Sequence, residues 1–198
     1  FVSVFIGASL IFYGDEFILR WLGPRFIESY DVAAVLAFGY TLTLMQHPSS
    51  SLLYGLSKHH YGAALAILQG ILNVALSIPL AGYLGLPGVA WGTTIGLSIN
   101  ILLIQPFVVC RIVKLPTTRY YGAIASITLK TLVPLGLFFA LAAPYLKAEY
   151  TRIALVGTIQ LLIFIPVTLR FILNADERIL LKAALNRKNV EPFALLEA

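Results

Sequence analysis

The chain has 198 residues, of which 59% are hydrophobic and 12% charged, and its mean hydropathy is +0.88. Soluble domains carry about 25% charged residues, so this composition excludes an ordinary soluble domain and indicates an integral membrane protein. The net charge of +5 does not point to nucleic acid, because the basic residues are spread over short loops, where the anionic face of a membrane suits them better. The single cysteine, Cys110, excludes an internal disulfide framework, and no Cys/His spacing typical of a zinc site occurs.

The first apolar stretch covers residues 1–13 and is followed by Gly14-Asp15-Glu16. At 1.5 Å per residue it gives about 20 Å of helix, which is less than the roughly 30 Å of a hydrocarbon core. We therefore expect a truncated span, and a chain that is the C-terminal portion of a longer protein. Residues 16–26 are expected to form a short interfacial helix, because Trp21 suits the headgroup level.

The next predicted span covers residues 30–56 and has Gln46, His47 and Pro48 near its middle. His47 is the ionisable residue nearest the middle of a complete predicted span, and such a group is by default a functional hypothesis. Gln46 and His47 are therefore candidate residues of a substrate path. The alternative for His47 is a structural role, as a neutral imidazole hydrogen-bonded to a neighbouring helix.

The centre of the chain is predicted to be a hairpin of two spans, 61–84 and 86–113, joined by a Gly/Pro turn. Each exceeds the roughly 20 apolar residues that cross a membrane, and helix satisfies the backbone there. In the first span Gln69, Asn73 and Ser77 recur every four residues and share one helical face. Gln69 and Asn73 are candidate path residues, with hydrogen bonding between helices as the alternative for Asn73.

Small residues recur in the second span of the hairpin. Gly88, Gly92 and Gly96 are spaced by four and lead to Asn100. Such a stripe predicts a face on which another helix packs closely. Asn100 continues it with a polar group and is the last candidate path residue.

Two additional spans are predicted in residues 114–170, over 120–146 and 153–169. Lys130 and Pro134 interrupt the first, so we expect an interfacial start up to Lys130 and a shorter core segment after it. Residues 171–198 read as an amphipathic helical tail on the cytoplasmic membrane surface. A tail that binds a partner protein is the alternative.

The basic residues predict the orientation, because short cytoplasmic loops carry the excess of Lys and Arg. One topology places four of them outside: Arg20, Arg25, Lys147 and Arg152. It places ten inside: Lys58, Arg111, Lys114, Arg119, Lys130, Arg170, Arg178, Lys182, Arg187 and Lys188. The C-terminus is therefore predicted to be cytoplasmic.

Four short segments of the chain, in order, are Ile-Leu-Arg-Trp-Leu-Gly (18–23), Leu-Tyr-Gly-Leu-Ser-Lys (53–58), Ile-Leu-Asn-Val-Ala-Leu (71–76) and Gly-Leu-Pro-Gly-Val-Ala-Trp-Gly-Thr (85–93). In this order and spacing they resemble the C-terminal half of polysaccharide flippases of the O-antigen/teichuronic acid exporter type. These belong to the multidrug/oligosaccharidyl-lipid/polysaccharide exporter superfamily. The resemblance covers residues 1–111 by motif and the remainder by helix number.

The resemblance implies an all-α, polytopic transmembrane bundle, part of a transporter with two pseudo-symmetric lobes around a central cavity. Residues 1–113 would form the C-terminal part of the second lobe, and 114–170 two additional helices. Such a protein flips lipid-linked oligosaccharides of the undecaprenyl-pyrophosphate type across the bacterial cytoplasmic (inner) membrane by alternating access. It implies membrane lipids and polysaccharide polymerase machinery as further partners, and no cofactor beyond a coupling ion, H⁺ or Na⁺.

Two other transporters fit the same pattern: a cation-coupled multidrug antiporter of this superfamily, and a peptidoglycan lipid-precursor flippase. A membrane-embedded enzyme is the third class, and it is disfavoured. It would need clustered acids or histidines for acid–base or metal chemistry. The close acidic pairs, Asp15/Glu16 and Asp176/Glu177, lie at predicted helix ends, where helix capping explains them.

Overall fold

The computed structural model describes residues 1–172, and within that range it contains helices and no strand. The prediction of an all-α bundle is confirmed. The α-helices are α1 (Val2–Trp21), α2 (Glu28–Met45), α3 (His47–Gly55), α4 (His59–Leu84), α5 (Leu86–Ile99), α6 (Gln105–Val113), α7 (Thr117–Ala142) and α8 (Tyr150–Val167). Short 3₁₀ segments cover Pro24–Phe26 and Ala143–Tyr145, and π-helical segments cover Asn100–Ile104 and Thr168–Ile172. Of the tail predicted over residues 171–198, the part after residue 172 lies outside the described residues.

Five of the described segments are long and apolar enough to cross a membrane: Val2–Trp21, His59–Leu84, Leu86–Val113, Thr117–Tyr145 and Tyr150–Phe171. The last four correspond to the spans predicted over 61–84, 86–113, 120–146 and 153–169. By length and composition, then, the fold is that of a polytopic membrane protein.

The first helix differs from its prediction, because α1 does not end at Gly14 but continues to Trp21. Gly14 instead permits a close helix contact: a Cβ there would lie 3.0 Å from the ring of Tyr30. The chain turns at Gly23, whose φ of +88° favours glycine. The separate interfacial helix predicted over 16–26 is therefore wrong.

The span predicted over 30–56 is divided into α2 and α3 at Gln46, which has φ −95° and ψ −2°. Pro48 explains the division. It has no backbone N–H to donate to the carbonyl of Leu44, and its ring crowds that turn. Neither half is among the five segments long and apolar enough to span.

The interruption predicted in the span over 120–146 is absent, since the continuous helix α7 contains both Lys130 and Pro134. A proline is tolerated within a membrane helix when neighbouring groups satisfy the freed carbonyl. Lys130 is exposed on the surface of α7.

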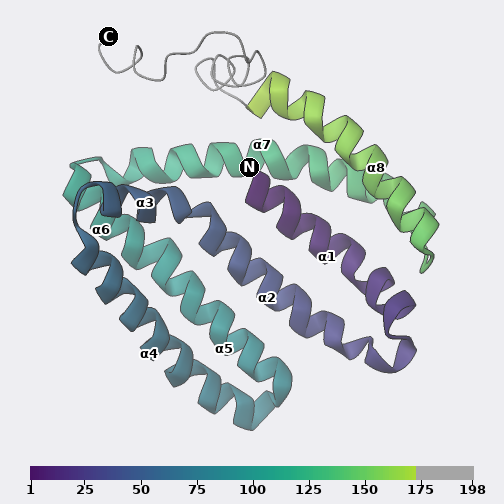
Figure 1. Ribbon diagram of the computed structural model, residues 1–198, viewed down its shortest axis with the longest axis horizontal. Coiled ribbons are helices and arrows are strands. Elements are labelled where there is room, and N and C mark those ends of the chain that lie inside the picture. The colour runs from purple at the N-terminus through teal and green to yellow at the C-terminus, as the bar shows by residue number, and fades with distance from the viewer. Residues whose placement is uncertain (173–198) are drawn as a thin grey trace.

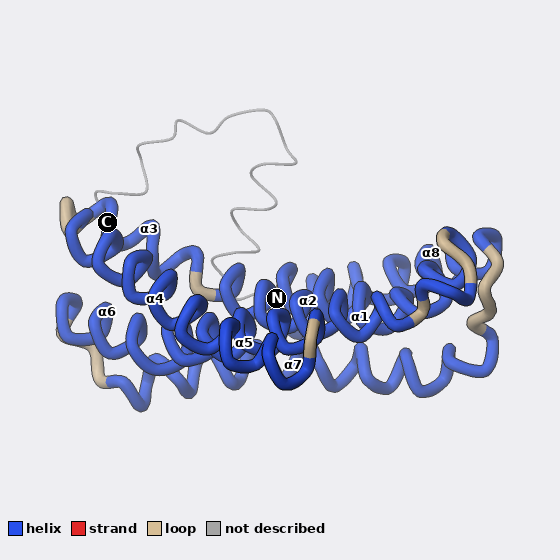
Figure 2. Tube along the Cα trace, turned by 90° about the horizontal axis from the view of Figure 1, so that it is seen from below, coloured by secondary structure: helices blue, strands red, loops and turns tan. Residues whose placement is uncertain are grey.

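Four helices lie side by side in the order α4, α5, α2, α1, and α8 contacts α1 beyond them (Figure 1). α7 runs across this layer and contacts α1, α6 and α8. Figure 2 shows α7 along one face of the layer. The order is not that of the chain, because α2 pairs with α5 and leaves the α3–α4 segment outside that pair.

The helix α4 shows how the layer divides its residues between neighbours and surroundings. Ile71 and Ile78 are 60% and 68% exposed, whereas Ser77, which lies against Gly92 of α5, is 8% exposed. An apolar outer face and a polar inner face are expected of a helix that contacts lipid on one side and protein on the other. The polar stripe of the sequence therefore points into the bundle.

Candidate functional site

Gln46 lies at the α2–α3 break and is 2% exposed. Its side-chain oxygen accepts hydrogen bonds from Tyr120 of α7 and from Ser49, 3.1 Å away. The hydroxyls of Ser49 and Tyr120 are also 2.7 Å apart. These hydrogen bonds connect the α2–α3 break to α7 through the side chain of Gln46.

Gln105, the first residue of α6, also hydrogen-bonds to the α2–α3 break. Its amide Nε2 donates to the carbonyl oxygen of Gln46 at 3.3 Å and to Oγ of Ser50 at 3.0 Å. Gln105 is 4% exposed. Neither Gln105 nor Tyr120 is among the path residues predicted from the sequence. Gln105 follows Asn100 by five residues, and only the intervening π-helical turn, with its i→i+5 hydrogen bonds, places both on one face.

A cavity of about 250 Å³ lies between α2, α3, α4 and the α5–α6 segment. We call it the Asn100 cavity. Its lining includes three of the predicted path residues, His47, Gln69 and Asn100, together with Gln105. His47 is exposed at its edge. The structure thus brings together residues from three predicted spans.

Asn100 is 2% exposed, and the two polar atoms of its side-chain amide differ in their hydrogen bonding. Its Nδ2 donates to Oε1 of Gln69 at 2.9 Å and to the backbone oxygen of Leu65 at 3.4 Å. Its Oδ1 is buried and has no hydrogen-bond partner among the described residues. Asn100 therefore links the end of α5 to α4 through Nδ2, and its Oδ1 is an acceptor without a partner within residues 1–172.

Asn73 lies outside the cavity, in the seam between α4 and α5. Its Oδ1 is 3.0 Å from Oγ of Ser77 and 3.4 Å from Oγ1 of Thr93, and both hydroxyls can donate to it. The Ser77 hydroxyl is also 3.4 Å from the backbone oxygen of Val89. Asn73 thus joins the two helices, which is the structural alternative that its sequence position allowed.

The three glycines of α5 lie against α4 in the same seam. A Cβ at Gly88 would lie 2.0 Å from the backbone oxygen of Leu80, and one at Gly92 would lie 2.5 Å from Cα of Ser77. At Gly96 the nearest atom would be the backbone nitrogen of Asn73, at 3.2 Å. The first two distances are shorter than any ordinary contact, so a side chain there would force the helices apart.

A second polar link, not selected from the sequence, joins α1 to α8. Gln160 is 3% exposed; its Nε2 donates to Oγ of Ser9 at 2.7 Å and its Oε1 accepts from the hydroxyl of Tyr13 at 2.7 Å. A lone glutamine in an apolar span is the signal that could have found it. Polar residues of this kind commonly hydrogen-bond across membrane helices.

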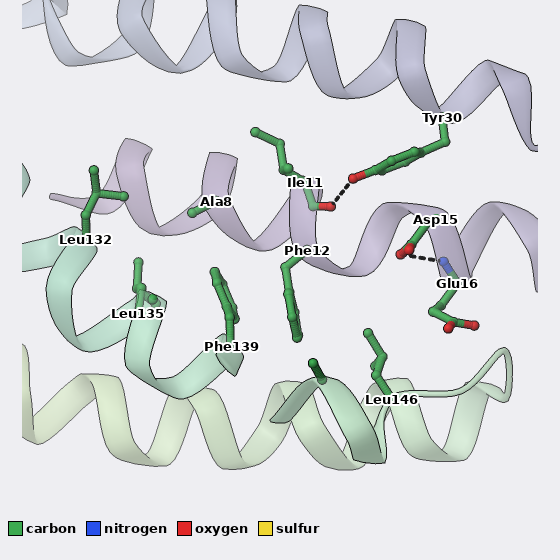
Figure 3. Close-up of a pocket in the computed structure, with 12 residues that line it drawn as sticks. Ala8, Ile11, Phe12, Asp15, Glu16, Tyr30, Leu132, Leu135, Phe139 and Leu146 are labelled. Carbon is green, nitrogen blue, oxygen red and sulfur yellow. Dashed lines mark hydrogen bonds between the residues drawn. The ribbon is translucent and has the colours of Figure 1, made fainter. Parts of the chain in front are cut away.

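A groove of about 510 Å³ lies between α1 and α7 (Figure 3). Its floor is apolar, and the rings of Phe12 and Phe139 stack there with centroids 4.1 Å apart. The hydroxyl of Tyr30 donates to the backbone oxygen of Ile11 at 2.7 Å beside it. Asp15 lies at one end, where its carboxylate accepts from the backbone N–H of Glu16 at 2.8 Å.

The chemistry available in the Asn100 cavity is that of amide, hydroxyl and imidazole groups, which form hydrogen bonds. Within residues 1–172, no three His, Cys, Asp or Glu side chains gather as a metal site would require. The cavity lining contains two titratable rings, those of His47 and Tyr54, and no Asp, Glu, Lys or Arg. It can therefore bind and orient a polar group.

Apolar helices of spanning length around buried, uncharged polar clusters define the class: a polytopic helical membrane protein. Comparison of the chain with protein-family models, with curated proteins and with solved structures gives no match.

Proposed function

We propose that the protein is a membrane transporter that flips lipid-linked oligosaccharide across the bacterial cytoplasmic membrane by alternating access. The observation that carries this proposal is the Asn100 cavity, where the polar side chains of His47, Gln69 and Asn100, from three separate helical segments, line one hollow in an apolar bundle. Polar groups are costly to place inside a membrane, and they commonly mark the path of a polar cargo. A helix broken beside such a hollow, as at Gln46, is also a recurrent feature of transporters.

The four segments that resemble polysaccharide flippases support this cargo over others. In this reading residues 1–113 belong to the second lobe of the transporter and residues 114–170 add two helices. The cargo would be an undecaprenyl-pyrophosphate-type glycan, delivered to polysaccharide polymerase machinery on the outer side. The amide and hydroxyl groups of the cavity suit sugar hydroxyls, which both donate and accept hydrogen bonds.

The test is complementation of bacterial cells that lack their own flippase. The full-length protein should restore glycan on the cell surface, measured per unit of membrane-inserted transporter. Cells carrying an empty vector set the baseline. Failure to restore surface glycan, together with expulsion of cationic dyes, would replace the proposal with the multidrug antiporter of the same superfamily.

A further inference from the structure

The groove of about 510 Å³ between α1 and α7 shares no lining residue with the Asn100 cavity. We call it the α1–α7 groove (Figure 3). Its walls are mostly apolar side chains of two segments of spanning length, and the stacked rings of Phe12 and Phe139 form its floor. Leu132 is 43% exposed and Gly136 is also exposed, so the groove opens to the surroundings of the helices. For helices that cross a membrane, those surroundings are lipid.

The polar side chains of the lining gather at one end of the groove (Figure 3). Tyr30 uses its hydroxyl hydrogen on the backbone oxygen of Ile11, 2.7 Å away. Asp15 and Glu16 are partly buried, and one oxygen of Asp15 accepts from the backbone N–H of Glu16 at 2.8 Å. Within residues 1–172 neither carboxylate forms an ion pair, and no Lys or Arg is among the lining residues. The apolar groove therefore ends at two carboxylates whose charge is not offset within the groove.

The position of these carboxylates along α1 places them near a membrane interface. Glu16 precedes the end of the helix at Trp21 by five residues, which is about 8 Å at 1.5 Å per residue. Trp21 is 64% exposed, and tryptophans of membrane helices concentrate at the headgroup level. From Glu16 the groove runs back along α1 to Ala8, about 12 Å further into the bilayer. An acidic end at headgroup level with an apolar body beneath it matches the layout of a single phospholipid.

Cations lie outside the lining at the same end of the groove. Arg20 follows Glu16 by one helical turn, and its guanidinium lies 5.4 Å from the centre of the Tyr150 ring. Lys147 is exposed and directly follows Leu146, which lines the groove at the carboxylate end (Figure 3). A zwitterionic headgroup suits this arrangement, because its phosphate attracts the cations while its amine binds the carboxylates.

The charges select the headgroup and not the acyl chain. An acyl chain that moves from the bilayer into the groove exchanges one apolar environment for another, so it supplies little free energy. A primary ammonium has three N–H donors, which form short, charge-assisted hydrogen bonds with carboxylates. A trimethylammonium headgroup has no such donor, and a glycerol headgroup leaves the lipid with a net negative charge that the carboxylates repel. We propose that the α1–α7 groove binds a phospholipid with a primary amine in its headgroup, with the ammonium at Asp15 and Glu16 and an acyl chain over Phe12 and Phe139.

This inference goes beyond the proposed function, because it assigns a lipid of the surrounding bilayer to a site separate from the Asn100 cavity. The resemblance to flippases implies membrane lipids only in general, whereas the groove specifies one headgroup class and one place for it. The test measures binding and not transport. A failure here would leave the proposed function standing, and a failure of glycan export would leave the lipid site standing.

The experiment follows thermal unfolding of the purified full-length protein in detergent micelles with added lipid. The probes are phosphatidylethanolamine, phosphatidylcholine and phosphatidylglycerol with identical acyl chains. We expect phosphatidylethanolamine to raise the Tm with a saturable dependence on its mole fraction, and the other two lipids to raise it less at every fraction. Equal Tm values in phosphatidylethanolamine and phosphatidylcholine would overturn the proposal, because the carboxylates would then not distinguish the two headgroups.

One variant tests the acidic end of the groove. Glu16→Gln keeps the side-chain shape and removes a charge, so it should raise the half-saturating fraction of phosphatidylethanolamine several-fold. Asp31→Asn is its control, since Asp31 lies in the first turn of α2 and does not line the groove. This control should keep the wild-type dependence on the lipid.

A second variant tests the apolar body of the groove. A Cβ at Gly136 meets nothing within 4 Å, so Gly136→Leu should keep the Tm measured without lipid but lose most of the increment from phosphatidylethanolamine. Gly157→Leu is the matched control in α8, where a Cβ also meets nothing within 4 Å and the position does not line the groove. An increment of wild-type size in both Glu16→Gln and Gly136→Leu would contradict the site.

Discussion

Gly92 shows how one residue sets the separation of two helices. A Cβ there would lie 2.5 Å from Cα of Ser77, so Gly92→Leu should push α4 away from α5. Overpacking of this kind costs about 1–3 kcal/mol, and we expect less folded protein and a lower Tm in detergent. Gly70→Leu is the matched control, because a Cβ at Gly70 meets nothing within 4 Å. Equal losses in the two variants would remove the packing argument.

His47 tests whether the cavity lies on the path of the cargo. The side chain is exposed at the cavity edge, so His47→Ala should leave the amount of protein in the membrane near normal. In the proposed flippase it should lower surface glycan per inserted transporter. His60→Ala is the control, since His60 stands outside the cavity beside Tyr61. A wild-type ratio for His47→Ala would refute its place on the path, and a joint loss of abundance and export would make it structural.

The candidate residues could be selected from the sequence because of their spacing, but their partners could not. The four-residue period of an α-helix correctly placed Gln69 and Asn73 on the inner face of α4. The same period fails after Asn100, where the π-helical turn shifts the phase and places Gln105 on the cavity wall. No residue pattern in this single sequence predicts the π-helical turn. Gln160 was missed for a different reason, because a lone polar residue has no period.

At the scale of elements, the helices were predictable and several of their ends were not. Apolar runs indicate helix because only helix satisfies the backbone in a membrane. The ends depend on contacts between elements. In the sequence Gly14 indicates a helix end, but in the structure it lies inside α1, where the ring of Tyr30 packs against it. In the same way, the break at Gln46 depends on Pro48 and on partners from α6 and α7.

The attachment of α8 to α1 through Gln160 gives a prediction for an element. Gln160→Met keeps the length of the side chain but removes its bonds to Ser9 and Tyr13. Hydrogen bonds between membrane helices are worth about 1 kcal/mol, so the Tm should fall measurably.

Thr158→Val is the matched control for this variant, because within residues 1–172 the Thr158 hydroxyl donates inside α8, to the backbone oxygen of Ala154 at 2.7 Å. Its Tm should stay near that of the unmodified protein. If Gln160→Met unfolds at the wild-type temperature, the polar link does not hold α8 in place.

At the scale of the whole molecule, the sequence predicts spans but not their order in space. Nothing in the helical pattern pairs α2 with α5, or sends α7 across the layer (Figure 1). Those contacts arise from steric fit between distant residues. One example is Gly39 of α2, where a Cβ would lie 2.9 Å from the hydroxyl oxygen of Thr94 in α5.

The topology is a prediction for the whole chain. Ten basic residues against four favour a cytoplasmic C-terminus. A C-terminal reporter enzyme that works only outside the cytoplasm should therefore be inactive in the full-length protein, and one that works only inside should be active. The opposite pattern of activities would invert the orientation and the direction assigned to transport.

The most direct test of the transport proposal uses the full-length protein in proteoliposomes with a fluorescent undecaprenyl-pyrophosphate oligosaccharide. A membrane-impermeant reductant destroys the fluorophore in the outer leaflet, and the rate at which protected lipid becomes accessible measures flipping. We predict faster exchange than in protein-free vesicles, with a lower rate for His47→Ala at equal protein content. Exchange no faster than in protein-free vesicles, from protein that is folded and inserted, would contradict the proposal.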